Sequence, residues 1–476
     1  MLRIVKHWLL FLPVIFFVGC GIFHKPVRVD LDQIRVRGKL IAITGYSANS
    51  YFIYKGQTMG YEYELLNLLA QDLNLDLEIV IAHSMTGIFD DLNEGRGDII
   101  AHNLIVTKPR RKRIAFTEYI TTTRQVLVQR KPRNWRAMKL HEIDRHIITS
   151  PIDLIGKTIH VRQGSAYVER LKNLSDEIGG DIHIVEVPGD TSTDELIWQV
   201  AQGKIEYTIA DENIAKINQS YYRDLDVRTP VSLPQRVAWA VRKSSPQLLA
   251  AVDEWIRKMK KKADYYVIYN KYFKNRFDFR RWIGSEYFSQ TGGKISPYDS
   301  LLQVNTKKIN WDWRLLASLV YQESQFLPFK KSWAGAVGLM QLMPKTAREF
   351  GARNLLDPQE NIEAGTNYLH WLQNYWKDIP DSSERVKFIL ASYNVGTGHV
   401  QDARKLAEKY GRNPNIWQDN VAFYLLRKSQ KEYYDDAIVN FGYCRGEEPI
   451  RYVNEILQRY EHYRNLLKES RVSADK

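Results

Sequence analysis

The sequence of 476 residues contains only two cysteines, Cys20 and Cys444. Two cysteines cannot build a cysteine metal site or a disulfide-rich scaffold. Histidine offers no metal site either, because His370, His399 and His462 lack acidic or histidine partners at coordinating spacing. A glycine-rich phosphate loop is also missing. We therefore expect neither a metal ion nor a bound cofactor.

An apolar run long enough to cross a membrane comfortably is missing from the N-terminus, where Trp8–Val18 is short and follows Arg3 and Lys6. This layout is typical of a signal peptide. The segment Phe17–Cys20 resembles a bacterial lipobox, whose cysteine becomes the lipidated first residue, although phenylalanine departs from the usual aliphatic residue. We expect a protein on the periplasmic side of the envelope, associated with the outer membrane as a lipoprotein through Cys20. An uncleaved N-terminal anchor would also place the rest of the chain outside the cytoplasm. An acylated Cys20 leaves no intrachain disulfide.

Acidic residues are fewer than basic ones, 55 against 68, and the formal net charge is +13. A positive field favours anionic partners, such as carboxylate-bearing polymers, phospholipid surfaces or nucleic acid. No arginine-rich recognition helix, zinc pattern or stacking motif accompanies the charge, which argues against nucleic acid. We interpret the charge as a basic surface suited to a polyanionic envelope.

The first half of the chain alternates between short apolar runs and helix-like segments, which indicates parallel sheets. One set of elements covers residues 35–125 and a second set follows it, so we expect two similar α/β lobes with a cleft between them. The expected strands are Lys39–Thr44, Leu77–Ala82, Asp98–Ala101, Thr158–Val161, His183–Val187, Tyr207–Ala210 and Trp239–Arg242, with helices at Tyr61–Leu73, Ile88–Leu92, Ala166–Leu174, Asp194–Gln202 and Gln247–Lys260.

The residue composition changes between Tyr272 and Ser300, where arginine, aromatic residues and a Gly-Gly pair predict a linker. Beyond it only helix-like segments follow, separated by glycine, proline and asparagine. The expected architecture is a multidomain chain with a two-lobed α/β domain followed by an all-α domain. Its divisions are a signal segment at 1–20, the α/β domain at 21–275, a linker at 276–300 and the helical domain at 301–476.

Four places in the first half carry a recognisable order of residues. They are the helix opening Gly60–Leu65, the spaced trio Thr107, Arg110 and Phe116, the segment Gly156–Tyr167, and Asp211 after the run Tyr207–Ala210. Together they resemble a family 3 periplasmic solute-binding domain over residues 35–275. The resemblance implies that Arg110 grips a ligand α-carboxylate, that Ser165 opens an anion-binding helix, and that Asp211 holds an α-ammonium.

The chemistry of these three residues suits a small amino acid or a stem-peptide fragment. An arginine fork and helix N-terminal amides bind carboxylates, and an opposed aspartate binds an ammonium. Other readings exist, since Arg110 lies in a basic run that would ordinarily be a solvated face and Asp211 could simply cap the following helix. A scaffold that has lost its ligand is the alternative.

Ordered motifs also fill the second half. They are Tyr321–Phe326, Ser332, the glycine- and methionine-rich Gly335–Pro344, Ala391–Gly396, and Tyr452-Val453 with Ile456. These motifs resemble the catalytic domain of family 1 lytic transglycosylases over residues 300–465, which implies a lysozyme-like helical fold and peptidoglycan glycan strands as the substrate.

Glu323 is the candidate catalytic acid. The apolar face Leu315–Val320 leads into it, so its carboxyl group is expected to be partly desolvated, with a raised pKa that keeps it protonated near neutral pH. Ordinary glycosidases use two carboxylates, whereas the nearest alternatives, Asp312 and Glu349, lie outside the motifs. The resemblance implies that Glu323 protonates the oxygen between MurNAc and GlcNAc and then deprotonates the muramic C6 hydroxyl, which closes a 1,6-anhydro ring.

Supporting residues follow from the same motifs. Ser332 and Tyr393 are expected to hydrogen-bond Glu323 or the acetamido group, and Tyr452 to approach the catalytic carboxyl. Amide groups suit sugar hydroxyls and methionines suit sugar faces, although either methionine could instead be core packing. The remaining candidates for substrate binding are Gln341, Asn394, Met340 and Met343.

Two further function classes stay open from the sequence. A lysozyme-type hydrolase could use the same helical scaffold and would leave reducing-end MurNAc. A non-enzymatic solute-binding or sensor protein could carry a degenerate helical tail. Because a complete binding pattern is fused to a complete catalytic one, we also expect cleft ligands to tune the enzyme.

Overall fold

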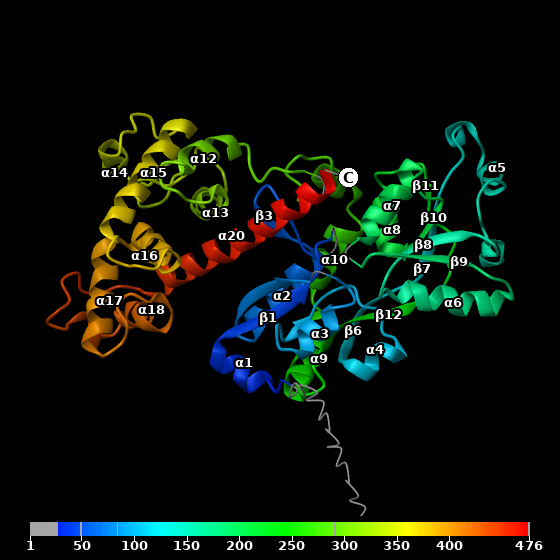
Figure 1. The fold of residues 1–476 in the computed structure, drawn as a ribbon, viewed down its shortest axis with the longest axis horizontal. Coiled ribbons are helices and arrows are strands. Elements are labelled where there is room, and N and C mark those ends of the chain that lie inside the picture. Colours follow the sequence, from blue (N-terminus) through cyan, green and yellow to red (C-terminus); the bar gives the residue numbers. More distant parts are fainter. Residues whose placement is uncertain (1–26, 48–49, 83, 190, 290–291, 475–476) are drawn as a thin grey trace, which may run out of the picture.

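The computed structural model describes residues 27–47, 50–82, 84–189, 191–289 and 292–474. The predicted signal segment and lipobox, including Cys20, therefore lie outside the described residues. Within them, no helix is both long enough and apolar enough to cross a bilayer. Figure 1 shows the helical domain, a first α/β lobe in the middle and a second α/β lobe following one another across the molecule.

The first lobe is built on a five-stranded sheet in the order β4-β1-β5-β12-β6. Strands β1, β4 and β5 are parallel, whereas β12 runs antiparallel to both β5 and β6. The strands are β1 (Lys39–Thr44), β4 (Asp76–Ile81), β5 (Ile99–Ile100), β6 (Ala115–Thr123) and β12 (Gln235–Val241), and the helices are α1 (Leu31–Arg37), α2 (Tyr61–Asp72), α3 (Ile88–Asn93), α4 (Lys108–Arg113), α9 (Pro246–Met259), α10 (Ala263–Phe273) and α11 (Arg276–Ile283).

The second lobe repeats the plan with a sheet in the order β11-β7-β10-β8-β9. The chain enters this lobe from β6 into β7 and returns through β12, so two connections join the lobes. Its strands are β7 (Gln125–Arg130), β8 (Thr158–Arg162), β9 (His183–Val187), β10 (Tyr207–Asp211) and β11 (Leu225–Asp226), with helices α5 (Leu140–Asp144), α6 (Ala166–Ile178), α7 (Thr193–Gln202) and α8 (Glu212–Gln219) and 3-10 turns at Trp135–Ala137 and Pro151–Leu154.

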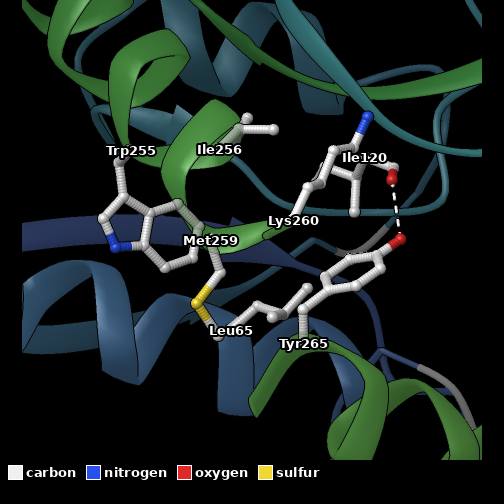
Figure 2. A pocket seen from close by; sticks show the side chains of 7 residues that line it. All are labelled: Leu65, Ile120, Trp255, Ile256, Met259, Lys260 and Tyr265. Carbon is white, nitrogen blue, oxygen red and sulfur yellow. Dashed lines mark hydrogen bonds between the residues drawn. The ribbon is translucent and has the colours of Figure 1, made fainter. Parts of the chain in front are cut away.

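The core of the first lobe is closely packed. Between α2, α9 and α10 it leaves a cavity of only about 10 Å³, lined by Leu65, Trp255, Met259 and Tyr265 among others (Figure 2). The Tyr265 hydroxyl donates to the carbonyl of Ile120 across it, at 2.8 Å. This volume is at the lower limit for one water molecule, so the gap is a packing defect and not a ligand site.

The second half is all helical in its described part, as the sequence predicts. Leu316, Leu319, Phe388 and Val453 are among the buried residues of its core. Its helices are α12 (Asp299–Thr306), α13 (Trp313–Ser324), α14 (Pro344–Glu349), α15 (Pro358–Tyr375), α16 (Ser382–Val395), α17 (Thr397–Lys409), α18 (Ala422–Arg427), α19 (Lys431–Tyr434) and α20 (Glu447–Ala474), with a kinked turn at Trp417–Val421.

The segment predicted as a linker is packed. It contains α11, and Trp282 and Phe288 are buried against the first lobe. Residues around Phe288 run beside a hairpin formed by β2 (Phe52–Tyr54) and β3 (Gln57–Met59), with a bridge between Tyr54 and Phe288. Helix α20 reaches from the helical domain to this hairpin (Figure 1), where the Tyr463 hydroxyl donates to the carbonyl of Gly56 at 2.9 Å. The two domains are therefore in direct contact.

Candidate functional site

Glu323 lies in the last turn of α13. The preceding turns bury Leu316, Leu319 and Val320 in the helical core, and this anchoring fixes the direction of the glutamate side chain. The carboxyl group accepts a hydrogen bond from the hydroxyl of Tyr452 on α20. Glu323 is thus held by a partner that lies far away in the sequence.

The environment of Glu323 favours its protonated form. Burial raises the pKa of its carboxyl group to about 7, while the Tyr452 hydrogen bond and the charge of Lys330 act in the opposite direction. Lys330 also donates from Nζ to the backbone carbonyl of Glu323 at 2.7 Å. A carboxyl group with a pKa near 7 can both give and take a proton near neutral pH.

The chain reverses sharply directly after α13. Gln325 and Phe326 both adopt left-handed backbone conformations, with φ of 54° and 61°. The loop that follows is fixed by side chains: Gln341 donates from Nε2 to the carbonyls of Lys330 and Gly338, both at 2.9 Å. Its amide hydrogens are therefore engaged in holding the loop, and the carbonyl oxygen of the Gln341 side chain is what remains for a substrate.

Ser332 lies in the same loop as a half-buried residue and closes a small turn. Its hydroxyl oxygen accepts from the backbone N–H of Ala336 at 3.0 Å, and its own N–H donates to the Ala336 carbonyl at 2.9 Å. The oxygen is thus used in shaping the loop, while the hydroxyl hydrogen is free to rotate toward an acceptor.

The two candidate methionines have different environments. Met340 is 0% exposed, and its sulfur packs so closely on α15 that a β-carbon at Gly365 would lie 2.2 Å from it. Met340 is therefore core packing, and it cannot contact a sugar face in this arrangement. Met343, by contrast, is 45% exposed.

Tyr393 and Asn394 come from the end of α16. The Tyr393 hydroxyl donates to the carbonyl of Met340 at 2.7 Å, and Glu323 is close enough to raise the pKa of this buried phenol further. Asn394 is exposed and lines a pocket of about 310 Å³ together with His399, Arg445 and Glu448. The motif thus supplies one partly buried phenol and one exposed amide.

The three candidates of the α/β domain meet between the two lobes. Arg110, from the first lobe, is buried and donates to the carbonyl of Ile105 at 3.0 Å and to that of Gly164 in the second lobe at 3.2 Å. Asp211 accepts from Nδ2 of Asn103, which again joins the lobes. In the described residues the lobes are therefore closed on each other.

Unsatisfied polar atoms mark this interface. Ser165 Oγ and Asp211 Oδ1 are buried without a hydrogen-bond partner among the described residues. Burial raises the pKa of Asp211 to about 7, although Tyr167, Asn103 and Arg110 oppose the shift. A buried polar atom without a partner costs about 1–3 kcal/mol, and a ligand ammonium or hydroxyl would remove that cost.

Some neighbours were not predicted from the sequence. Lys330, Asn103 and Asn361 lie outside the motifs, yet Asn361 accepts from the backbone of Met340 at 2.8 Å and donates to the carbonyls of Val337 and Leu355. Only the approach of distant segments reveals their roles. Within the described residues no three His, Cys, Asp or Glu side chains are grouped to hold a metal ion.

Each half of the chain matches a known protein family. Residues 41–275 match the family described as bacterial extracellular solute-binding proteins, family 3, and residues 300–416 match the transglycosylase SLT domain. An ancestral amino acid-binding protein, a precursor of cyclohexadienyl dehydratase, is 24% identical in its crystal structure, with a TM-score of 0.43; the match covers 51% of this chain and 99% of that one.

Two relatives match nearly the whole chain. A membrane-bound lytic murein transglycosylase F of Desulfosudis oleivorans is 36% identical over 447 residues, which cover 93% of this chain and 94% of the relative. One from Pseudomonas fluorescens is 32% identical over 458 residues, or 95% of this chain and 90% of the relative. The chain therefore belongs to the family of the membrane-bound lytic murein transglycosylases F.

Proposed function

We propose that this protein is a peptidoglycan lytic transglycosylase that cleaves the β-1,4 bond between MurNAc and GlcNAc without water and releases 1,6-anhydromuramoyl products. The observation that carries the proposal is the carboxyl group of Glu323, which is held by Tyr452 in surroundings that raise its pKa to about 7. The names of the full-length relatives support the murein substrate.

The positions of the two acidic alternatives named from the sequence support a mechanism with one carboxylate. Asp312 caps the start of α13 and is paired with Arg314. At about 1.5 Å per residue, Asp312 and Glu323 are ~16 Å apart along the helix axis, whereas two-carboxylate glycosidases need roughly 5–9.5 Å between the groups. Glu349 is exposed and is not among the groups that shift the pKa of Glu323.

The reaction then takes place in two proton transfers, both through the carboxyl group of Glu323. Protonated Glu323 donates to the glycosidic oxygen, and the bond to the anomeric carbon breaks. The resulting carboxylate is stabilised by the Tyr452 hydroxyl and accepts the proton of the muramic C6 hydroxyl, whose oxygen attacks the anomeric carbon. Glu323 ends protonated again, so the cycle closes without water, and the acetamido oxygen of the substrate stabilises the positive charge meanwhile.

The remaining candidate residues of the catalytic domain are assigned to glycan binding. Met343 offers an apolar contact for a sugar face, and Asn394 offers an amide at the edge of the pocket of about 310 Å³. Ser332 and Gln341 contribute through the remaining hydroxyl hydrogen and amide oxygen. Tyr393 supports the site from beneath by fixing the Met340 carbonyl.

Product analysis tests this function. Purified sacculi incubated with the native protein should yield anhydromuropeptides by mass spectrometry, and Glu323→Gln should yield none, because an amide cannot donate the catalytic proton. Reducing-end MurNAc would instead show a hydrolase. An inactive native protein would favour a solute-binding or sensor protein.

The α/β domain is assigned a regulatory role, as a site for an amino acid or a stem-peptide fragment that modulates cleavage. Arg110 and Ser165 face a ligand carboxylate and Asp211 faces an ammonium, and the buried atoms without partners support this. A ligand can act only if it binds one domain arrangement better than another. Equal turnover with and without a saturating stem peptide, or a ligand response that persists in Arg110→Ala, would overturn the role.

The proposed organisation follows the expected divisions: a signal segment at 1–20 with Cys20 as the lipid-anchored residue, the non-catalytic domain at 21–275, a connecting segment at 276–300 and the catalytic domain at 301–476. The word membrane-bound in the names of the relatives supports an envelope location. Metabolic labelling with a radiolabelled fatty acid, lost in Cys20→Ala, tests the anchor.

A further inference from the structure

The β2–β3 hairpin belongs by sequence to the α/β domain but packs into the catalytic domain. Ile53 is 2% exposed and is part of the same apolar cluster as Leu316 and Leu319 of α13. Its backbone is fixed by Ser289, which donates to the Ile53 carbonyl at 2.9 Å while its Oγ accepts from the Ile53 N–H at 3.0 Å. The hairpin therefore completes the core on which the catalytic helix lies.

Gly56 forms the tip of this hairpin and has no room for a side chain. A β-carbon there would lie 2.6 Å from the ring of Phe326, 2.7 Å from the ring of Tyr321 and 2.9 Å from the hydroxyl of Tyr463. The backbone φ is +77°, and the Gly56 carbonyl accepts from Tyr463 at 2.9 Å. Three aromatic side chains of the catalytic domain thus close around the backbone of this glycine.

These contacts bear on a strained part of the chain. Tyr321 and Phe326 flank Glu323, and their rings pack edge to face with centroids 5.8 Å apart. Gln325 and Phe326 are non-glycine residues in the left-handed region, a strained conformation that persists only where packing holds it. For Phe326, that packing includes the hairpin tip.

Two groups that bind Glu323, Lys330 and Tyr452, depend on this arrangement. The loop after Phe326 carries Lys330, which binds the Glu323 carbonyl. Helix α20 carries Tyr463, which binds the hairpin, and also Tyr452, which binds the Glu323 carboxyl about three helical turns away. A shift of the tip would therefore be passed to Glu323 through the loop and through the helix.

We infer that Gly56 is a positioning residue for Glu323: the hairpin of the solute-binding domain clamps Tyr321, Phe326 and Tyr463 and so completes the catalytic site. The inference rests on the proposed function of Glu323. It adds a residue of the non-catalytic domain to the machinery of cleavage, independently of any ligand between the lobes.

The test compares two glycine substitutions in the full-length protein. Gly56→Ala introduces a β-carbon into the aromatic contact. Gly38→Ala is the matched control in the same lobe, because its φ of +75° imposes the same backbone strain while nothing lies within 4 Å of a β-carbon. Tyr463→Phe is a third variant, which removes only the hydrogen bond to the Gly56 carbonyl. Cleavage of a soluble glycan fragment is measured as kcat and KM across pH, and Glu323→Gln is run beside them.

Gly56→Ala should lower kcat at pH 7 by about tenfold or more at similar KM, in line with the cost of a small misplacement of a catalytic group. The high-pH limb of the kcat profile of this variant should move to lower pH, because water admitted beside Glu323 favours the carboxylate. Gly38→Ala should show neither effect. Equal profiles for the two alanine variants would overturn the inference.

If Gly56→Ala does not fold, Tyr463→Phe decides, since it leaves the core intact. A high-pH limb displaced to lower pH supports the clamp, and an unchanged limb overturns it. Activity retained in Glu323→Gln would instead refute the proposed function, so the two failures can be told apart.

Discussion

At the scale of single residues, the site depends on how few groups surround one carboxyl. Glu323 has a phenol as its hydrogen-bond donor and a lysine nearby, and burial outweighs both in setting its pKa. Burial disfavours the charged form of Glu323, and each neighbour stabilises it. Loss of a neighbour would therefore raise the pKa of Glu323, and loss of burial would lower it.

Tyr452→Phe should move the high-pH limb of kcat upward, by about one pH unit. The Tyr452 hydroxyl stabilises the carboxylate, so its loss raises the pKa of Glu323 above 7, and a general acid stays protonated to higher pH. The kcat profile on a soluble glycan fragment measures this. Tyr424→Phe, at another buried tyrosine of the catalytic domain, should leave the limb in place; a downward movement in Tyr452→Phe would contradict the assignment.

Glu62 gives a residue-scale prediction for stability. It is buried in α2, accepts from the indole N–H of Trp239 at 2.6 Å, and burial raises its pKa from 4.5 to about 7. A raised folded-state pKa contributes stability below pH 4.5 that is lost as pH rises through 7. Glu62→Gln should therefore match the native protein near pH 4.5 and exceed it at pH 9, by up to about 3 kcal/mol in the free energy of unfolding. A difference that does not change with pH would refute this.

At the scale of elements, two helix glycines differ in how freely the side chain packed against each of them can move. Gly365 of α15 lies against the sulfur of Met340, which is fully buried, whereas Gly398 of α17 lies against Phe441, which is 59% exposed. Both contacts are too close for a β-carbon, but only the exposed phenylalanine can move away into solvent.

Gly365→Ala should therefore lower the free energy of unfolding by about 1–3 kcal/mol, although alanine ordinarily stabilises a helix relative to glycine. Gly398→Ala should be neutral or stabilising by up to about 1 kcal/mol. Urea unfolding of both variants measures the difference. Equal stability of the two would mean that Met340 can repack.

The elements also show where prediction from sequence succeeds. Strand β1 and helix α2 were predicted because their apolar runs and helical periodicity are local signals. The strands β6 and β7, which lead from one lobe into the other, were not predicted, since Ala115–Arg130 mixes polar and apolar residues without clean alternation. The β2–β3 hairpin was missed for another reason: each strand has only three residues, and Ile53 is buried by the other domain.

At the scale of the whole molecule, the net charge of +13 acts on the substrate as a field. Peptidoglycan carries carboxylates on its stem peptides, so the field should increase its local concentration, and salt should screen the attraction.

Binding of the Glu323→Gln variant to intact sacculi should weaken by about tenfold between 50 and 500 mM NaCl. This variant is used because the proposed mechanism predicts that it leaves the polymer uncut. Co-sedimentation measures the bound fraction, and particulate chitin, an uncharged β-1,4-linked GlcNAc polymer, serves as the control, with little dependence on salt expected. Salt-independent binding to intact sacculi would show that the charge has another purpose.

The sequence by itself determined the order of the domains, the two-lobed and helical classes, the family and the choice of Glu323, because motifs and periodicity are properties of neighbouring residues. Only the tertiary structure decided the surroundings of that carboxyl: Tyr452 contacts it, whereas Met340 is buried in the core. It also placed Gly56 of the other domain against Tyr321 of the helix that carries Glu323. The reason is that burial and the pKa shifts it causes depend on segments hundreds of residues apart, and no local pattern records their approach.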